Sequence, residues 1–151
     1  MSAALNATAP FQFDTGTPPL VVLTMRSPMV DADYAKMFVE WEAILSRRNT
    51  IVAITDARAI KDRGTPKQRA VIAEWTKRIE PLVRSYSRGH AVVVDNALVR
   101  GAMTAVSWLH KTPVPEAYFT RFDEAVDWCV LQLEKSNVAV PPSLRALGTK
   151  R

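Results

Sequence analysis

The sequence predicts an α/β fold: a five-stranded mixed sheet with about four helices, in the order ββαβαβαβα. Two apolar runs carry this prediction, Ile51–Asp56 and Ala91–Asn96, because each is β-branched and uncharged until a carboxylate closes it. The apolar periodicity of a helix follows each run. This combination is typical of buried parallel strands with polar groups at their carboxyl ends. Ligands and partners are ordinarily met at that edge of an α/β sheet.

The first third of the chain predicts a hairpin and one helix. Residues 11–14 alternate, residues 20–25 form an apolar run, and the turn residues at 16–19 favour an antiparallel connection. Asp31 opens a helix whose apolar residues recur at spacings of three and four. That stripe consists of Tyr34, Met37, Phe38, Trp41 and Leu45. The third strand then spans residues 51–55.

A polar loop is expected from Asp56 to Gly64, followed by a second helix. Thr65 can cap this helix with Pro66 at its first position, where proline costs no hydrogen bond. Pro81 is expected to kink or end it. The fourth strand runs through Val94.

Asn96 is expected to cap a third helix, and residues 117–119 to form a short final strand. Residues 120–123 fit a capping box, with Asp in place of Glu, at the start of the last helix. That helix is lined by Phe122, Val126, Cys129, Val130 and Leu133. The predicted organisation is therefore a disordered segment at 1–10, one domain at 11–136 and an irregular basic tail at 137–151.

Bulk properties are those of one ordinary globular domain. The chain has 151 residues, is 48% hydrophobic and 23% charged, and carries a net charge of +5. This charge permits an anionic partner, but no basic and aromatic residues alternate as on a nucleic-acid surface, so nucleic acid is not expected as a partner. A single cysteine, no signal peptide and no apolar run of membrane-spanning length predict a cytoplasmic protein.

The two strand sequences and the ending Phe119-Thr-Arg-Phe-Asp-Glu-Ala-Val-Asp-Trp128 resemble the bacterial SpoIIAA-like group. In that group a STAS-like or Sec14-like fold occurs without a settled activity, and the resemblance extends from Phe11 to about Ser136. It implies a STAS-like domain that is a non-enzymatic regulatory or protein-interaction module. The Asp-Ser pair that carries the phosphoswitch of STAS-type anti-sigma-factor antagonists is absent, since the region reads Asp56-Ala57-Arg58.

The predicted contact surface lies at the carboxyl edge of the sheet. It consists of Asp56, Arg58, Lys61, Arg63 and Thr65, with Asp95, Asn96 and Arg100 close by. A basic loop before a helix N-terminus suits a phosphate, a lipid head group or an acidic partner, whereas the plainer interpretation is a solvated loop. Asp56 and Asp95 would act as an acid and base or hold a divalent ion, or else only cap turns.

A protein partner is the first expectation, and a homodimer is compatible with it. Two other functions stay open: a carrier of a small lipid-like or anionic ligand, and an enzyme that uses Asp56 and Asp95. No cofactor is expected. His90 and His110 offer no metal-ligand spacing, Cys129 is interpreted as a core thiol, and Trp108 is either packed or an exposed contact residue. An apolar cavity would favour the carrier, and carboxylates converging in a pocket would favour the enzyme.

Overall fold

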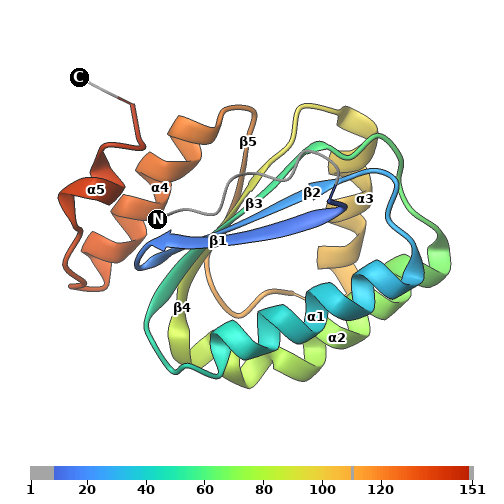
Figure 1. Ribbon diagram of the computed structural model, residues 1–151, viewed down its shortest axis with the longest axis horizontal. Helices are drawn as coiled ribbons and strands as arrows, with labels where there is room; N and C mark the ends of the chain where they lie inside the picture. Colours follow the sequence, from blue (N-terminus) through green and yellow to red (C-terminus); the bar gives the residue numbers. More distant parts are fainter. Residues whose placement is uncertain (1–8, 110, 150–151) are drawn as a thin grey trace.

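A computed structural model describes residues 9–109 and 111–149 (Figure 1). The expected disorder of the first eight residues and the end of the basic tail, Lys150 and Arg151, lie outside these ranges. The strands are β1 (Phe11–Thr17), β2 (Leu20–Arg26), β3 (Ile51–Ala59), β4 (Ser87–Val93) and β5 (Glu116–Phe119). The helices are α1 (Asp31–Leu45), α2 (Pro66–Tyr86), α3 (Ala97–Leu109), α4 (Phe122–Lys135) and α5 (Pro142–Arg145). The predicted α/β class and element order are confirmed, with α5 added at the end.

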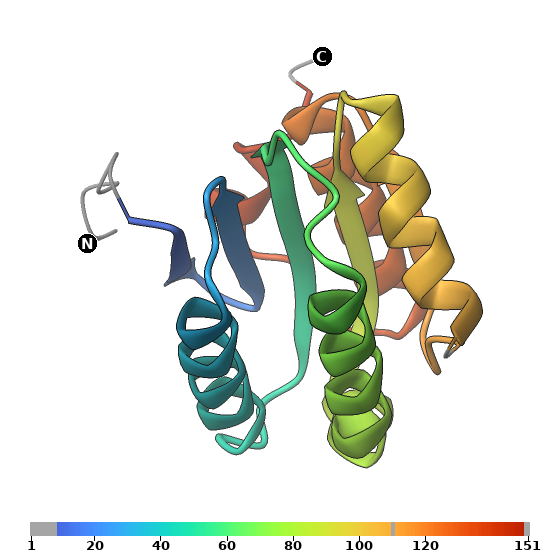
Figure 2. The ribbon, with the colours of Figure 1, turned by 90° about the vertical axis from the view of Figure 1, so that its right-hand side faces the viewer.

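The order of the strands across the sheet follows the order of the chain, β1-β2-β3-β4-β5. β1 and β2 form the expected antiparallel hairpin, and β2 to β5 are parallel. Crossovers between parallel strands are almost always right-handed. Three successive crossovers in one direction therefore place α1, α2 and α3 on one face of the sheet, whereas α4 and α5 cover the other (Figures 1 and 2).

Each face of the sheet has its own hydrophobic core, because neighbouring residues of a strand point to opposite faces. On β3, Ile51 belongs to the core under α1 and α2, whereas Val52 and Ile54 belong to the core under α4. In the first core, the rings of Phe38 and Trp75 stack with centroids 4.4 Å apart. The layers are thus helix, sheet and helix.

The polar loop after the third strand begins later than predicted. β3 continues through Asp56 to Ala59 because β2 continues beside it, and Arg26 pairs with Ala59 in the register. Asp56 lies between Thr24 and Val93 on the two neighbouring strands. The carboxylate therefore stands inside the strand rather than at its end.

Pro81 was expected to kink or end the second helix. It does not end the helix, because α2 continues to Tyr86. A proline inside a helix removes one backbone donor and crowds the preceding turn. Ile79 is buried before it, and Leu82 and Val83 pack against the same core after it. Apolar burial on both sides offsets the lost hydrogen bond.

The expected capping box at residues 120–123 is wrong as well. Arg121 is the residue that precedes the first turn of α4, and its side chain makes no capping hydrogen bond. The Asp123 carboxylate instead pairs with the Arg121 guanidinium, at 2.6 Å between Oδ2 and Nη2.

The segment predicted to be irregular after Ser136 contains α5, which lies against α4. Leu144 is 0% exposed and belongs to the core between α4 and the sheet. Arg145 forms an ion pair with Glu134 of α4, and the hydroxyl of Thr149 donates a hydrogen bond to Asp127. This segment is therefore attached to the domain by the apolar packing of Val138, Val140 and Leu144 and by polar contacts to Glu134 and Asp127.

Candidate functional site

Two of the predicted surface residues form a pair within β3. The Arg58 guanidinium donates two hydrogen bonds to Asp56, at 2.9 Å from Nε to Oδ1 and 2.7 Å from Nη2 to Oδ2. These hydrogen bonds raise the pKa of Arg58 despite partial burial, and the charge of Asp95 adds to the effect. The Asp56 carboxylate is thus already paired with a cation from its own strand.

Thr65 and Asn96 cap helices, as the sequence predicts. Thr65 Oγ1 accepts a hydrogen bond from the Gln68 amide at 3.0 Å, and Gln68 Oε1 accepts one from the Thr65 amide at 3.0 Å. Asn96 Oδ1 accepts hydrogen bonds from the amides of Leu98 and Val99. Both polar groups satisfy free helical N–H groups.

The remaining predicted residues are exposed and spread over the surface. Lys61 and Arg63 extend from the loop between β3 and α2, and Asp95 follows β4. The Arg100 guanidinium of α3 lies 5.4 Å from the centre of the Tyr118 ring. Among the described residues, no group of three or more His, Cys, Asp and Glu side chains is placed to hold a metal ion. None of the eight predicted residues lines the cavity described next.

A partly enclosed cavity of about 250 Å³ lies between the sheet and helices α1, α2 and α3. Its walls are mainly apolar side chains from all three helices and from β2 to β5. The aliphatic and aromatic part of the lining includes Leu23, Met25, Met37, Phe38, Trp41, Ala53, Ile72, Trp75, Ile79, Val92, Met103 and Val106.

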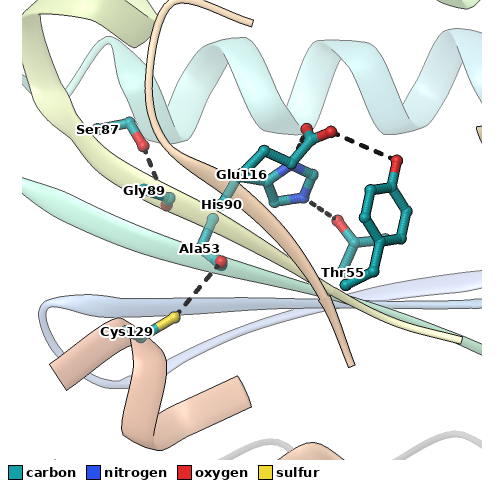
Figure 3. Close-up of polar contacts among 8 residues, drawn as sticks. Ala53, Thr55, Ser87, Gly89, His90, Glu116 and Cys129 are labelled. Carbon is teal, nitrogen blue, oxygen red and sulfur yellow. Dashed lines mark hydrogen bonds and ion pairs between the residues drawn. The ribbon is translucent and has the colours of Figure 1, made fainter. Parts of the chain in front are cut away.

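One polar network faces this cavity from the sheet (Figure 3). Thr55 Oγ1 lies 2.7 Å from His90 Nε2, and His90 Nδ1 lies 3.2 Å from Glu116 Oε2. The Tyr118 hydroxyl donates to Glu116 Oε1 at 3.3 Å. The four residues come from three adjacent strands and bring the polar groups of the sheet together at the apolar cavity.

Strand register explains why these side chains meet. His90 on β4 lies opposite Ala53 on β3 and opposite Glu116 on β5. Residues two apart on a strand share a face, so Thr55 joins Ala53 and Tyr118 joins Glu116. Asp56, one residue after Thr55, points away from the cavity by the same rule.

The network holds Glu116 as a carboxylate and Tyr118 as a phenol. Burial acts to raise the pKa of Glu116, but the hydrogen bond and charge of His90 and the hydroxyl of Tyr118 outweigh it, and the pKa is lowered. Burial, with the nearby Glu116 charge, raises the pKa of Tyr118 to about 12. At neutral pH the carboxylate is therefore an acceptor and the phenol a donor.

The opposite face of the sheet contains the cysteine and no part of this network (Figure 3). Cys129 of α4 is fully buried, and its thiol lies 3.8 Å from the carbonyl oxygen of Ala53. Burial raises the pKa of this thiol to about 12. These surroundings match a core thiol, because a reactive cysteine needs access and a lowered pKa.

Of the four tryptophans, two line the cavity, Trp128 packs against the core on the other face of the sheet, and Trp108 lies at the surface. Trp41 and Trp75 line the cavity, and Trp75 Nε1 donates a hydrogen bond to Glu42 Oε1 at 2.9 Å. Trp108 of α3 is 83% exposed, which is the second of the two alternatives left open for it.

Sequence reasoning missed Thr55, His90, Glu116 and Tyr118 as a group. The available signal was a polar residue at a cavity-facing position on each of three neighbouring strands. Using it requires the register, because His90 and Glu116 are 26 residues apart in the chain. The apolar run ends at the Asp56 carboxylate, so the sequence pattern pointed to Asp56, whereas its neighbour Thr55 faces the cavity.

By its architecture the chain has an α/β fold of the SpoIIAA-like type. It is similar to the crystal structure of an uncharacterised protein of the DUF3478 family, with a SpoIIAA-like fold, from Shewanella loihica PV-4. The TM-score is 0.56 at 19% sequence identity, over 85% of this chain and 98% of that chain. The expected SpoIIAA-like fold is thereby confirmed. No family model and no curated protein sequence matches the chain.

Proposed function

We propose that this domain binds a small, neutral and mainly apolar molecule between its sheet and helices α1 to α3. The observation that carries the proposal is the cavity of about 250 Å³ with one polar network on its wall. Ligand sites are concave, mostly apolar and equipped with few polar groups that orient the ligand. An apolar cavity of about 150 Å³ in another protein holds benzene, so this one has room for a substituted benzene.

The charges around the cavity favour a neutral ligand over an anionic one. Glu116 contributes a carboxylate, and among the described residues the lining contains no lysine or arginine. A buried anion without a cationic partner would carry a large desolvation cost. Of the two ligand types in the carrier hypothesis, the lipid-like one is therefore better supported.

Ethylbenzene is a suitable first probe, because it is neutral, apolar and smaller than the cavity. A ligand that binds the folded state raises the melting temperature. We expect ethylbenzene to raise it and to change the fluorescence of Trp41 and Trp75, which line the cavity.

The Ala53→Leu variant tests the location. The three added carbons enter the cavity, whereas Ala43→Leu places them on the exposed side of α1. Ala53→Leu should abolish the ethylbenzene response and Ala43→Leu should keep it. A response equal in both variants, or no response in the wild-type protein, contradicts the proposal.

A second proposal is that the domain makes regulatory protein contacts through its basic loop. The exposed side chains of Lys61, Arg63 and Lys67 favour it, because they extend from one region of the surface. Arg58 is partly engaged by Asp56, so we expect Arg63 to contribute more to partner binding than Arg58. A pull-down from the native host should lose its bound protein when Arg58 and Arg63 are both replaced by Glu. Unchanged binding would remove this surface from consideration.

In the part of the chain that the structure describes, no helix has the length and apolar character needed to cross a membrane.

A further inference from the structure

The direction of the hydrogen bonds in the polar network is fixed by Glu116. A carboxylate has acceptor atoms and no proton to donate. His90 Nδ1, at 3.2 Å from Glu116 Oε2, must therefore carry the proton that this hydrogen bond uses. The Tyr118 hydroxyl donates to the other oxygen of the same carboxylate.

The same reasoning fixes the role of Thr55. In a neutral imidazole that is protonated on Nδ1, Nε2 carries a lone pair and accepts. When His90 is neutral, the Thr55 hydroxyl, 2.7 Å from Nε2, therefore donates its proton to His90. Thr55 Oγ1 then has no proton left to donate, but its lone pairs can still accept a hydrogen bond. Thr55 is part of the cavity wall.

Three other polar hydrogens around the cavity are likewise directed at protein atoms. The Thr76 hydroxyl donates to the Ile72 carbonyl at 2.8 Å, and the Ser87 hydroxyl donates to the Gly89 carbonyl at 3.3 Å. Trp75 Nε1 donates to Glu42. With their protons committed, these hydroxyls also have acceptor capacity left over.

We propose that the cavity prefers, among small apolar molecules, those with one hydrogen-bond donor such as a hydroxyl group, and that Thr55 Oγ1 accepts this hydrogen bond. The inference rests on the proposed ligand-binding function and names the class of ligand. A donor-bearing ligand pairs with the Thr55 lone pair. A ligand of the same shape with acceptors alone would bring lone pair against lone pair, and burial without a hydrogen bond is costly.

Two isomeric probes isolate this effect: para-ethylphenol, which has a hydroxyl donor, and para-methylanisole, which has the same atoms and no donor. Ethylbenzene serves as the reference without a polar group. Dissociation constants are measured in mildly alkaline buffer, where histidine side chains are ordinarily neutral. We expect para-ethylphenol to bind about tenfold more tightly than para-methylanisole, as a neutral hydrogen bond allows.

Matched variants test the assignment to Thr55. Thr55→Val keeps the shape and removes the hydroxyl, and should reduce the preference to within about twofold. Thr76→Val makes the same change at another cavity-lining threonine, whose hydroxyl is bonded within its own helix, and should keep the preference. In the wild-type protein, nuclear Overhauser contacts should join the bound phenol ring to the Thr55 methyl group, which gives a test that does not depend on the folding of a variant.

The outcomes separate this inference from the function beneath it. Equal binding of the two isomers, with ethylbenzene also bound, overturns the donor preference and leaves ligand binding in place. Binding of none of the three probes overturns both. A preference that survives Thr55→Val, or is lost in Thr76→Val, overturns the role of Thr55, as do ring contacts to the Thr76 methyl group in place of the Thr55 methyl group.

Discussion

Replacing Leu144 with alanine tests whether the C-terminal segment is an integral part of the domain. Leu144 lies on α5, is 0% exposed and packs into the core between α4 and the sheet. Leu147, three residues later, is 40% exposed. The two leucines offer the same chemical change at a buried and at a half-exposed position of one segment.

The size of the effect follows from what the substitution removes. Leu144→Ala deletes three buried carbon atoms, which costs about 2.4 kcal/mol of transfer free energy at about 0.8 kcal/mol each. The cavity left behind adds to this cost, and buried Leu→Ala changes fall at about 2–5 kcal/mol in all. We expect the free energy of unfolding to fall by about 3 kcal/mol. The melting temperature of a domain of this size should then fall by about 6–12 °C.

Urea denaturation followed by tryptophan fluorescence and by circular dichroism measures the change. Leu147→Ala, the control, should change the free energy of unfolding by less than about 1 kcal/mol. If Leu144→Ala and Leu147→Ala lie within about 0.5 kcal/mol of each other, α5 does not pack on α4 in solution and the reasoning fails.

Three further predictions concern single groups. Cys129 should resist thiol reagents in the folded protein and react at the rate of unfolding, since burial raises its pKa to about 12; rapid modification without denaturant would contradict this. Tyr118 should ionise with a pKa of about 12, above the ordinary tyrosine value, and Tyr118→Phe should remove that step from an absorbance titration. Because the folded protein holds this proton more tightly than the unfolded chain, stability should fall as the pH rises from 10.0 to about 12; a titration curve that Tyr118→Phe leaves unchanged would count against it. Gly89→Ala should destabilise the protein, because a Cβ there would lie 3.1 Å from atoms of Trp128 and Gln132, whereas Gly101→Ala, with open space and a helical backbone, should stabilise it by about 0.5–1 kcal/mol; equal effects would show that the space around Gly89 is misjudged.

Local patterns were sufficient to predict most of the fold. The helix from Asp31 to Leu45 ends where its apolar stripe ends, and Thr65 and Asn96 cap the helices that they precede. These features depend on residues within one or two turns of each other. α5 was missed because a four-residue helix with one buried leucine has no periodicity to detect.

The candidate site could not be predicted in the same way. Its network joins Thr55, His90 and Glu116, which meet through strand register and not through sequence proximity. The extension of β3 past Asp56 depends on its partner strand β2, which no local pattern in β3 reveals. The cavity arises from the packing of three helices on the sheet, so the shape of the site is a property of the whole layer.

The strand order gives the formation of this domain a direction. Every strand pairs with the one synthesised just before it, so the sheet can grow from β1 to β5 while the chain emerges from the ribosome. The helices that cover the first face arrive between those strands. The second face stays uncovered until the residues after β5 are made, because Leu20, Val52 and Ile54 are buried only by α4 and α5. The residues from α4 onward therefore cover an apolar face of the sheet that is exposed to water until they fold. A chain stopped before α4 would be prone to aggregate through that face.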